Sequence, residues 1–351
     1  MMSARRRNNT APGRTTKRSH QRFLRTLRSS LVRYENAHEA MGTVFTVVAY
    51  GLKCASLDET VDQAFREVDR MDGQLSHYKP ASELSIVNRE AYGRTVIVGP
   101  ELFRLLEDSL RYSEETFGAF DVTAGHLMKS WGFFLGLGRV PSRAKLAEAR
   151  ERVGYQHVKL DAPARSVRFD RRGIELDLGA IGKGYAVDRV IEILREAGIE
   201  RACVSSGSST IYALGSPPGE RGWKVAVRNP LGGAQPASIL RLQNLALSVS
   251  ACCEKFFESS GKTYGHIMDP RAGTPAGNLL MSMAISPSAT DSDALSTAFF
   301  VGGVNRSREY LQHHPNRGAI FYLRTRFGRA FRRLVLNSKF SAGSFLNIEE
   351  E

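Results

Sequence analysis

The chain has 351 residues, of which 42% are apolar, 9% aromatic and 24% charged, which is the composition of a globular protein with one or two domains. This composition excludes a disordered chain, a collagen-like repeat and a small disulfide-bonded domain. No run approaches 18 apolar residues, so the sequence predicts no membrane-spanning helix. The four cysteines form neither CxxC nor CxxxC, which offers no zinc framework and fits a reducing compartment.

The net charge of +13 is concentrated in the first 34 residues, which carry ten Lys or Arg and no acidic residue, so that the remaining 317 carry only +3. We expect 1–34 to be a disordered basic tail and 35–351 to be one domain. Neither an apolar signal region nor a lipobox follows the basic residues, so a cytoplasmic location is expected for the sequence as written. Loose attraction to anionic surfaces explains such a tail more simply than a specific nucleic-acid arm, and nucleic acid is not expected as a partner.

Hydrophobic periodicity and turn residues predict mixed helices and short strands from about Met41 onward. In chain order the expected elements are a strand at 43–50, helices at 57–75, 101–117 and 141–153, a strand at 173–178, a helix at 182–198, strands at 202–205, 223–227, 238–242, 245–249 and 281–285, a helix at 292–301, and a hairpin of 319–325 and 330–336. Strict βαβ alternation is missing from this order, which favours an α+β fold over a doubly wound sheet.

Oxygen-bearing side chains gather at the start of the helix expected at 292–301. Asp293 is followed about one turn later by Ser296 and Thr297, a spacing that lets a carboxylate and hydroxyls face one point. Such oxygens are the ligands that Mg²⁺ accepts. The same residue types cap helix N-termini, so the pattern alone leaves a metal site and a simple cap both open.

Three further segments carry polar groups in irregular or glycine-rich sequence. Residues 266–271 (HIMDPR) place an imidazole, a carboxylate and a guanidinium together, although Asp-Pro-x-x-Gly is also common turn chemistry. The turn in 177–185 (DLGAIGKGY) frees backbone N–H groups for a phosphate at a helix N-terminus, or merely makes a tight bend. In 118–123 (GAFDVT), Phe120 can stack on a flat ring and Asp121 can hydrogen-bond it, or the two are core and cap residues.

Taken together and in order, these segments resemble the ApbE family of FAD:protein FMN transferases. The resemblance extends from Met41 to about Phe340 and rests on MGTVF (41–45), LSHYKPASELSIVN (75–88), GAFDVTAG (118–125), DLGAIGKGYAVD (177–188), HIMDPRAGTP (266–275) and DALSTAFFVGG (293–303). It implies an α+β fold related to T-fold proteins. It also implies an enzyme that binds FAD and Mg²⁺, transfers FMN to a Thr or Ser hydroxyl of an acceptor flavoprotein, and releases AMP. The implied acceptor is a redox-complex subunit or a reductase, and many members of the family are exported to the cell envelope.

The resemblance also implies roles for individual residues. Those expected to contact FAD are Met41, Tyr78, Ala119, Phe120, Asp121, Asp177, Lys183 and Met268. The metal is expected between the Ala180 carbonyl, Asp293 and Thr297, with Ser296 as a further oxygen. A hydroxyl nucleophile must lose its proton as it attacks, so a base is needed near the phosphorus. His266 is the candidate base, and Asp269 either orients it or acts as the base itself.

The sequence departs from the family pattern at two turns. Residues 206–209 read SGSS where a Gly-Gly turn is usual, and 250–253 read SACC where a Ser-Gly followed by Tyr is typical. Two other functions therefore remain open. One is a FAD pyrophosphatase that gives FMN and AMP, and the other is a catalytically silent flavin- or nucleic-acid-binding protein.

Overall fold

The computed structural model describes residues 31–52, 55–252, 255–277, 279–325, 330–340 and 343–349. Most of the expected basic tail therefore lies outside the described residues. Its last residues do not: β1 (Leu31–Ala40) pairs along its whole length with β2 (Thr43–Leu52), so the expectation that the folded part begins near Met41 was wrong. An edge strand has a single neighbour and is mostly exposed, so it needs few apolar residues and resembles a tail in composition.

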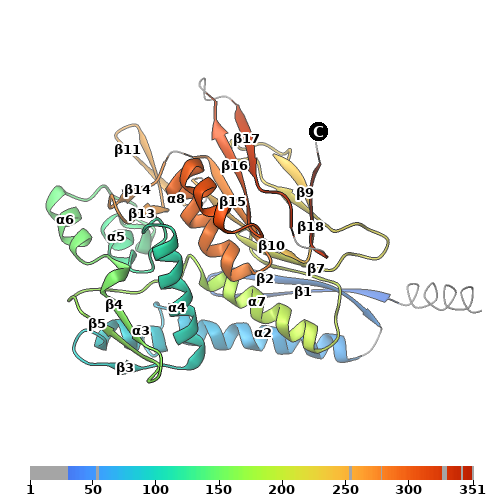
Figure 1. The fold of residues 1–351 in the computed structure, drawn as a ribbon, viewed down its shortest axis with the longest axis horizontal. Helices are drawn as coiled ribbons and strands as arrows, with labels where there is room; N and C mark the ends of the chain where they lie inside the picture. The colour runs from blue at the N-terminus through green and yellow to red at the C-terminus, as the bar shows by residue number, and fades with distance from the viewer. Residues whose placement is uncertain are drawn as a thin grey trace, which may run out of the picture.

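An eight-stranded antiparallel sheet forms the centre of the molecule, in the order β1-β2-β6-β7-β10-β15-β16-β17 (Figure 1). Its other strands are β6 (Ala202–Ser206), β7 (Thr210–Leu214), β10 (Leu245–Ala251), β15 (Met281–Ser286), β16 (Gly318–Arg324) and β17 (Phe331–Leu336). Helices pack on this antiparallel sheet without βαβ units, which confirms the predicted α+β class.

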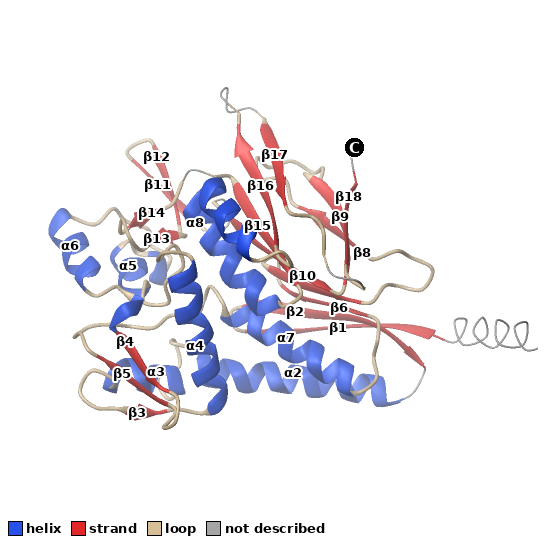
Figure 2. Cartoon of the chain, in the orientation of Figure 1, coloured by secondary structure: helices blue, strands red, loops and turns tan. Residues whose placement is uncertain are grey.

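The two faces of the sheet are covered differently. Helices α7 (Gly182–Glu196) and α8 (Ala289–His313) lie on one face, and α2 (Ala55–Leu75) packs against α7 (Figure 2). The other face carries a three-stranded sheet of β18 (Phe345–Glu349), β9 (Ser238–Gln243) and β8 (Trp223–Val227). Strand alternation sends Met283 and Ile285 toward the small sheet and Ala284 toward the helices.

The remaining elements form a lobe beside α7 and α8, at the left of Figure 1. They are α3 (Glu83–Glu90), β3 (Val96–Ile97), α4 (Pro100–Glu115), α5 (Gly125–Ser130), η1 (Phe133–Leu135), α6 (Arg143–Glu151), η2 (Tyr155–His157), β4 (Val158–Asp161), β5 (Ser166–Phe169), β11 (Phe256–Ser259), β12 (Lys262–Gly265), β13 (Met268–Asp269) and β14 (Thr274–Pro275). None of the short strands here was predicted, because two- to four-residue strands give little periodicity.

Two predicted elements differ from the structure. The strand expected at 173–178 does not form, because this segment hydrogen-bonds to the Asn88 side chain and, through the Asp177 N–H, to the Val122 carbonyl, and not to a neighbouring strand. The Leu176 N–H donates to Asn88 Oδ1 at 2.7 Å, and Asn88 Nδ2 donates back to the Leu176 carbonyl at 2.9 Å. Helix α8 is longer than expected and continues through a kink at Gly303, where φ is 71°.

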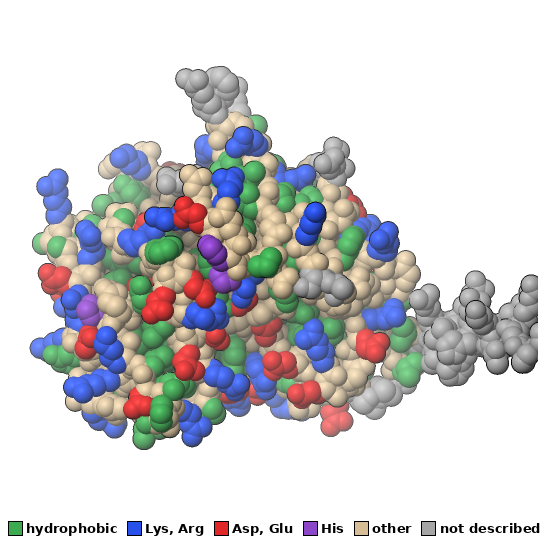
Figure 3. All heavy atoms as spheres, in the orientation of Figure 1, with side chains coloured by type: hydrophobic (Ala, Val, Ile, Leu, Met, Phe, Trp, Pro, Cys, Tyr) green, Lys and Arg blue, Asp and Glu red, His purple; other side chains and the backbone are tan. Residues whose placement is uncertain are grey.

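The hairpin expected at the C-terminal end is confirmed by the pairing of β16 with β17, although residues 326–329 at its tip lie outside the described ones. No helix among the described residues is long and apolar enough to cross a bilayer. On the face drawn in Figure 3, Lys and Arg side chains alternate with Asp and Glu rather than gathering into one basic area.

Candidate functional site

The N-terminal ends of α7 and α8 meet at Gly184 and Asp293. The Gly184 N–H donates to Asp293 Oδ2 at 2.9 Å, so two segments that are 109 residues apart in sequence lie in contact. A Cβ at residue 184 would lie 2.2 Å from the Ala289 carbonyl oxygen and 2.7 Å from the Asp293 Cβ. Only glycine permits this close approach of the two helices. The bend at DLGAIGKG and the helix of DALST, which the family resemblance expects to share a metal, therefore lie in contact.

Oxygen atoms converge where these helices meet. Asp293 is buried, and its Oδ1 accepts a hydrogen bond from Thr210 Oγ1 at 3.3 Å. Because the Gly184 N–H is directed to Asp293, the Ala180 carbonyl oxygen accepts no hydrogen bond from the described residues. A carboxylate, a hydroxyl and an unpaired backbone carbonyl are the oxygen donors that a small divalent cation accepts, so the residues fit Mg²⁺. Within the described part of the chain, His, Cys, Asp and Glu form no group of three or more placed to share a metal, so any site here depends on such mixed donors.

The two hydroxyls of the DALST segment face different surroundings. Ser296 is buried, its hydroxyl donates to the Asp293 carbonyl at 2.9 Å, and it lies 2.9 Å from Ser250 Oγ. Thr297 is only half-buried and keeps a longer contact of 3.3 Å with Ser250 Oγ. Ser296 is therefore engaged in holding α8 to the sheet, while Thr297 is the more available of the two as a ligand.

Asp177 and Lys183 lie on the bend before α7. The Asp177 carboxylate accepts a hydrogen bond from the Gly179 N–H at 2.8 Å and lies 3.3 Å from His77 Nδ1. Burial would raise the pKa of Asp177, but the hydrogen bond and charge of His77, the Gly179 N–H and the Lys183 ammonium together hold it below its ordinary value. Lys183 Nζ donates to the Gly179 carbonyl at 2.9 Å, so this lysine folds back over the bend.

Met41 and Tyr78 approach the same bend from other elements. Met41 lies in the turn between β1 and β2, and its Cε is 3.7 Å from the position that a Cβ of Gly182 would take. Tyr78 follows α2 and is 64% exposed, with its ring 4.0 Å from that of His77. Since His77 also contacts Asp177, the structure brings Met41, Tyr78 and Asp177 to one end of α7.

The GAFD segment lies farther along α8, and its side chains are mainly structural. Phe120 is 1% exposed and packs edge-on against Tyr112, so its ring has no open face for stacking on FAD. The Asp121 carboxylate accepts hydrogen bonds from the Thr123 N–H, the Thr123 hydroxyl and the Tyr155 N–H. Burial raises the pKa of Asp121 despite these bonds. Of the two alternatives that the sequence leaves open for this segment, core and cap residues fit the arrangement, and contact of Phe120 with FAD stays a prediction.

His266 is held by the backbone of the segment that precedes it. The Lys255 carbonyl lies 3.2 Å from Nδ1, and because a carbonyl can only accept, Nδ1 carries the proton and Nε2 is left with a free lone pair. Burial lowers the pKa of His266 to about 4, against the effect of this hydrogen bond, and the nearby Lys183 charge acts in the same direction as burial. The ring is therefore neutral at pH 7, which is the form a general base needs.

Asp269 and Met268 have other partners than those expected. Arg271 donates from Nε and Nη2 to the two Asp269 carboxylate oxygens, both at 2.9 Å, so Asp269 stabilises its own turn and the Lys255 carbonyl orients His266 in its place. Burial would raise the pKa of Asp269, but the Arg271 guanidinium holds it below its ordinary value. Met268 is buried in a small cluster with Leu127 and Trp131, which places its side chain in that core.

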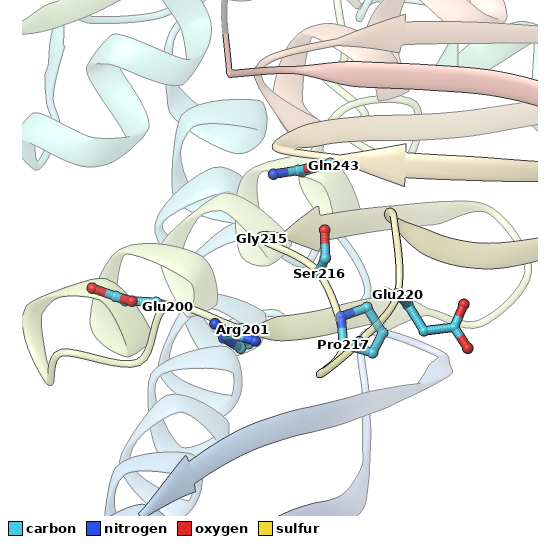
Figure 4. Close-up of a pocket in the computed structure, with 8 residues that line it drawn as sticks. Glu200, Arg201, Gly215, Ser216, Pro217, Glu220 and Gln243 are labelled. Atoms are coloured by element: carbon cyan, nitrogen blue, oxygen red, sulfur yellow. The ribbon is translucent and has the colours of Figure 1, made fainter. Parts of the chain in front are cut away.

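The described part of the structure has two cavities of about 460 Å³, and only one of them is lined by a residue with an expected role. One lies between the end of α4 and the second half of α8, and Ala119 lines it together with Phe117 and Gly302. The other is a groove beside the start of β6 and the end of β7 (Figure 4). Its lining is formed by Glu200, Arg201, Gly215, Ser216, Pro217, Gly219, Glu220 and Gln243. None of the residues with expected roles lines this groove.

The pattern of residues around α7 and α8 has counterparts in known proteins. The sequence model of the ApbE family matches residues 41–321. The chain belongs to the ApbE family. A protein of Treponema pallidum (strain Nichols) named FAD:protein FMN transferase is 31% identical over 334 residues, which cover 89% of this chain and 92% of that protein. One of Klebsiella pneumoniae (strain 342) with the same name is 31% identical over 278 residues, covering 78% and 86% of the two chains.

Solved structures agree with this ApbE membership. The crystal structure of the ApbE protein from Thermotoga maritima superposes with a TM-score of 0.77 at 30% identity and covers 86% of this chain and 97% of that one. The flavin transferase ApbE from Vibrio cholerae has the same TM-score at 24% identity, with 87% and 97% covered, and shows the shared fold.

Sequence reasoning missed several residues that build the site. Gly184 sits inside the quoted DLGAIGKG segment, but its contact with Asp293 depends on how two helices cross. Thr210, which holds Asp293, lies in none of the quoted segments, whereas His77, which holds Asp177, lies inside LSHYKPASELSIVN (75–88) without an expected role. Asp188, at the end of the same segment, accepts hydrogen bonds from the Ala289 and Thr290 N–H groups and so caps α8. A capping partner this remote in sequence leaves no local signal.

Proposed function

We propose that this chain is a Mg²⁺-dependent FAD:protein FMN transferase, which moves FMN from FAD to a Thr or Ser hydroxyl of an acceptor flavoprotein and releases AMP. The observation that carries the proposal is the contact between the Gly184 N–H and Asp293, because it joins a phosphate-type bend to an oxygen-rich metal site. The names of the Treponema and Klebsiella relatives support the same reaction.

The residues fit distinct tasks around the diphosphate of FAD. The Ala180 carbonyl, Asp293 and Thr297 would hold the metal, and Ser296 supports them from the buried side. When bound, Mg²⁺ neutralises charge on the diphosphate oxygens and stabilises the departing phosphate. Lys183 adds a positive charge at the same bend. Tyr78, Met41 and Asp177, which lie near the start of α7, would bind the rest of FAD.

The transfer itself needs a proton acceptor, and His266 supplies it. The hydroxyl oxygen of the acceptor bonds to the phosphorus of the FMN half, while the bond from that phosphorus to the bridging oxygen breaks. AMP leaves with the bridging oxygen, and the hydroxyl proton passes to Nε2 of His266. This nitrogen is free because Nδ1–H donates to the Lys255 carbonyl, and the ring is neutral because burial lowers its pKa to about 4.

The test measures AMP release and covalent flavin separately. Purified protein is incubated with FAD and Mg²⁺, with and without candidate flavoproteins, and the flavoproteins are analysed by mass spectrometry for attached FMN. We expect a flavin adduct on one candidate together with AMP. Rapid AMP release without any acceptor, and no adduct with one, would identify a FAD pyrophosphatase instead.

A second arm of the experiment tests the metal assignment. Asp293→Asn keeps an oxygen that can accept from the Gly184 N–H but removes the negative charge, so the fold should survive while Mg²⁺-dependent turnover falls at least about 100-fold. Asp62→Asn is the matched control, because that exposed carboxylate on α2 has no role in the proposed site. Full activity of Asp293→Asn would remove Asp293 from the metal site.

A further inference from the structure

The ring of Tyr78 is exposed and yet held in place. Although 64% of the residue is accessible, its ring packs against His77 with centroids 4.0 Å apart and stacks on Phe134 at 4.8 Å with an interplanar angle of 27°. An exposed tyrosine is ordinarily free to change rotamer and loses that freedom when a ligand binds. The two neighbouring rings limit this freedom before any ligand arrives.

Phe134 contacts Tyr78 from a short turn that is bounded by two glycines. It lies in η1 between Gly132 and Gly136, whose φ angles are 76° and 69°, so both ends of the short turn adopt the left-handed conformation. The preceding Phe133 has a different partner and packs on Phe257 with ring centroids 5.5 Å apart. Neighbouring aromatic residues thus anchor the loop on two sides, which directs Phe134 to Tyr78.

The polar surroundings of Phe134 support the same position. Lys129 Nζ lies 5.0 Å from the centre of the Phe134 ring, a cation–π distance, and the same ammonium is bound by Glu175. On the other side of the stack, His77 Nδ1 is 3.3 Å from Asp177 Oδ1. A continuous series of contacts therefore runs from α5 through Phe134, Tyr78 and His77 to the bend before α7.

We propose that Phe134 is a positioning residue for flavin binding, which holds Tyr78 so that its open face stacks on the isoalloxazine ring of FAD. The inference rests on the proposed function, since it takes FAD as the ligand. A stacked aromatic pair contributes favourably beyond its buried area, and a ring that is already oriented loses less entropy on binding. Phe134 thus acts on the flavin half of the substrate through Tyr78 and not on the AMP half.

The experiment measures dissociation constants for FAD, FMN and AMP by calorimetry, without an acceptor. For Phe134→Ala we expect FAD and FMN to bind about three- to tenfold more weakly, with AMP binding unchanged. In a Tyr78→Ala background the same change should have no further effect, because the ring that Phe134 positions is gone. Tyr92→Ala, another half-exposed aromatic residue, is the control and should leave all three constants unchanged.

Three results would overturn the inference. Unchanged FMN binding by Phe134→Ala would show that the stack has no role in binding. Equal weakening of AMP and FMN would show a general distortion of the site. An undiminished effect in the Tyr78→Ala background would show that Phe134 does not act through Tyr78. If the unmodified protein binds no FAD, the proposed function fails as well, and this result differs from all three.

Discussion

Gly184 and Asp293 are joined by a hydrogen bond of 2.9 Å from a backbone N–H to a carboxylate oxygen, and this bond links the N-terminal ends of α7 and α8. The contact turns one donor of α7 away from Ala180, and it orients the buried Asp293 carboxylate. One close approach between two helices therefore prepares two of the four expected metal ligands.

Gly184→Ala should separate these helices. Its new Cβ would lie 2.2 Å from the Ala289 carbonyl oxygen, so α7 and α8 must shift, and we expect a loss of about 1–3 kcal/mol in the free energy of unfolding with weaker Mg²⁺ binding. Urea denaturation and calorimetric titration measure the two effects. Gly73→Ala in α2 is the control, since no heavy atom lies within 4 Å of its new Cβ. Wild-type stability and metal affinity in Gly184→Ala would contradict this account of the contact.

Thr210→Val should weaken metal binding without removing a metal ligand. Thr210 is fully buried, donates to Asp293 Oδ1 at 3.3 Å and accepts from Ser248 Oγ at 3.0 Å. It therefore holds the Asp293 carboxylate in position from the sheet side. Loss of such a supporting hydrogen bond typically lowers metal affinity about tenfold or more. Titration with Mn²⁺, followed by the electron paramagnetic resonance of the free ion, measures the change. Thr210→Ser keeps the hydroxyl and should restore most of the affinity, and failure to do so would assign the effect to packing.

The titration of His266 should lie far below that of an ordinary histidine. An imidazole is neutral above its pKa, and burial lowers the pKa of His266 to about 4, so its lone pair stays available as the pH falls through 6.5. We expect no acid limb near pH 6.5 in the rate of FAD turnover. NMR titration of the histidine rings, with His266→Gln to assign the signal, gives the midpoint directly. A midpoint near 6.5 would show that the ring is solvated. It would contradict the claim that burial keeps His266 neutral for its role as general base.

Asp269→Asn separates two roles that the sequence leaves open for this residue. If Asp269 only stabilises its turn through Arg271, the substitution should cost at most about 1 kcal/mol of stability, since the ion pair is partly exposed. The His266 midpoint should not move, because the Lys255 carbonyl orients that ring. A large loss of turnover at unchanged stability would instead identify Asp269 as the base.

The sequence alone predicted the features that depend on local patterns. The amphipathic periods placed α2, α4 and α7 close to their observed positions, and the short strand from Trp223 to Val227 was predicted with its observed bounds. The order of the motifs also identified the family, which the match over residues 41–321 confirms. These features could be predicted because a helix or strand leaves its period in consecutive residues, and a motif keeps its residue types together.

The tertiary structure alone decided which side chains share a site. It placed Phe120 in the core and brought Thr210 and Gly184 to Asp293. These relationships arise from strand register and helix crossing, which join residues far apart in the chain and leave no trace in the spacing of either partner. The strand β1 was missed for a related reason. It is ordered by its hydrogen bonds to β2, and its own polar sequence shows no strand pattern.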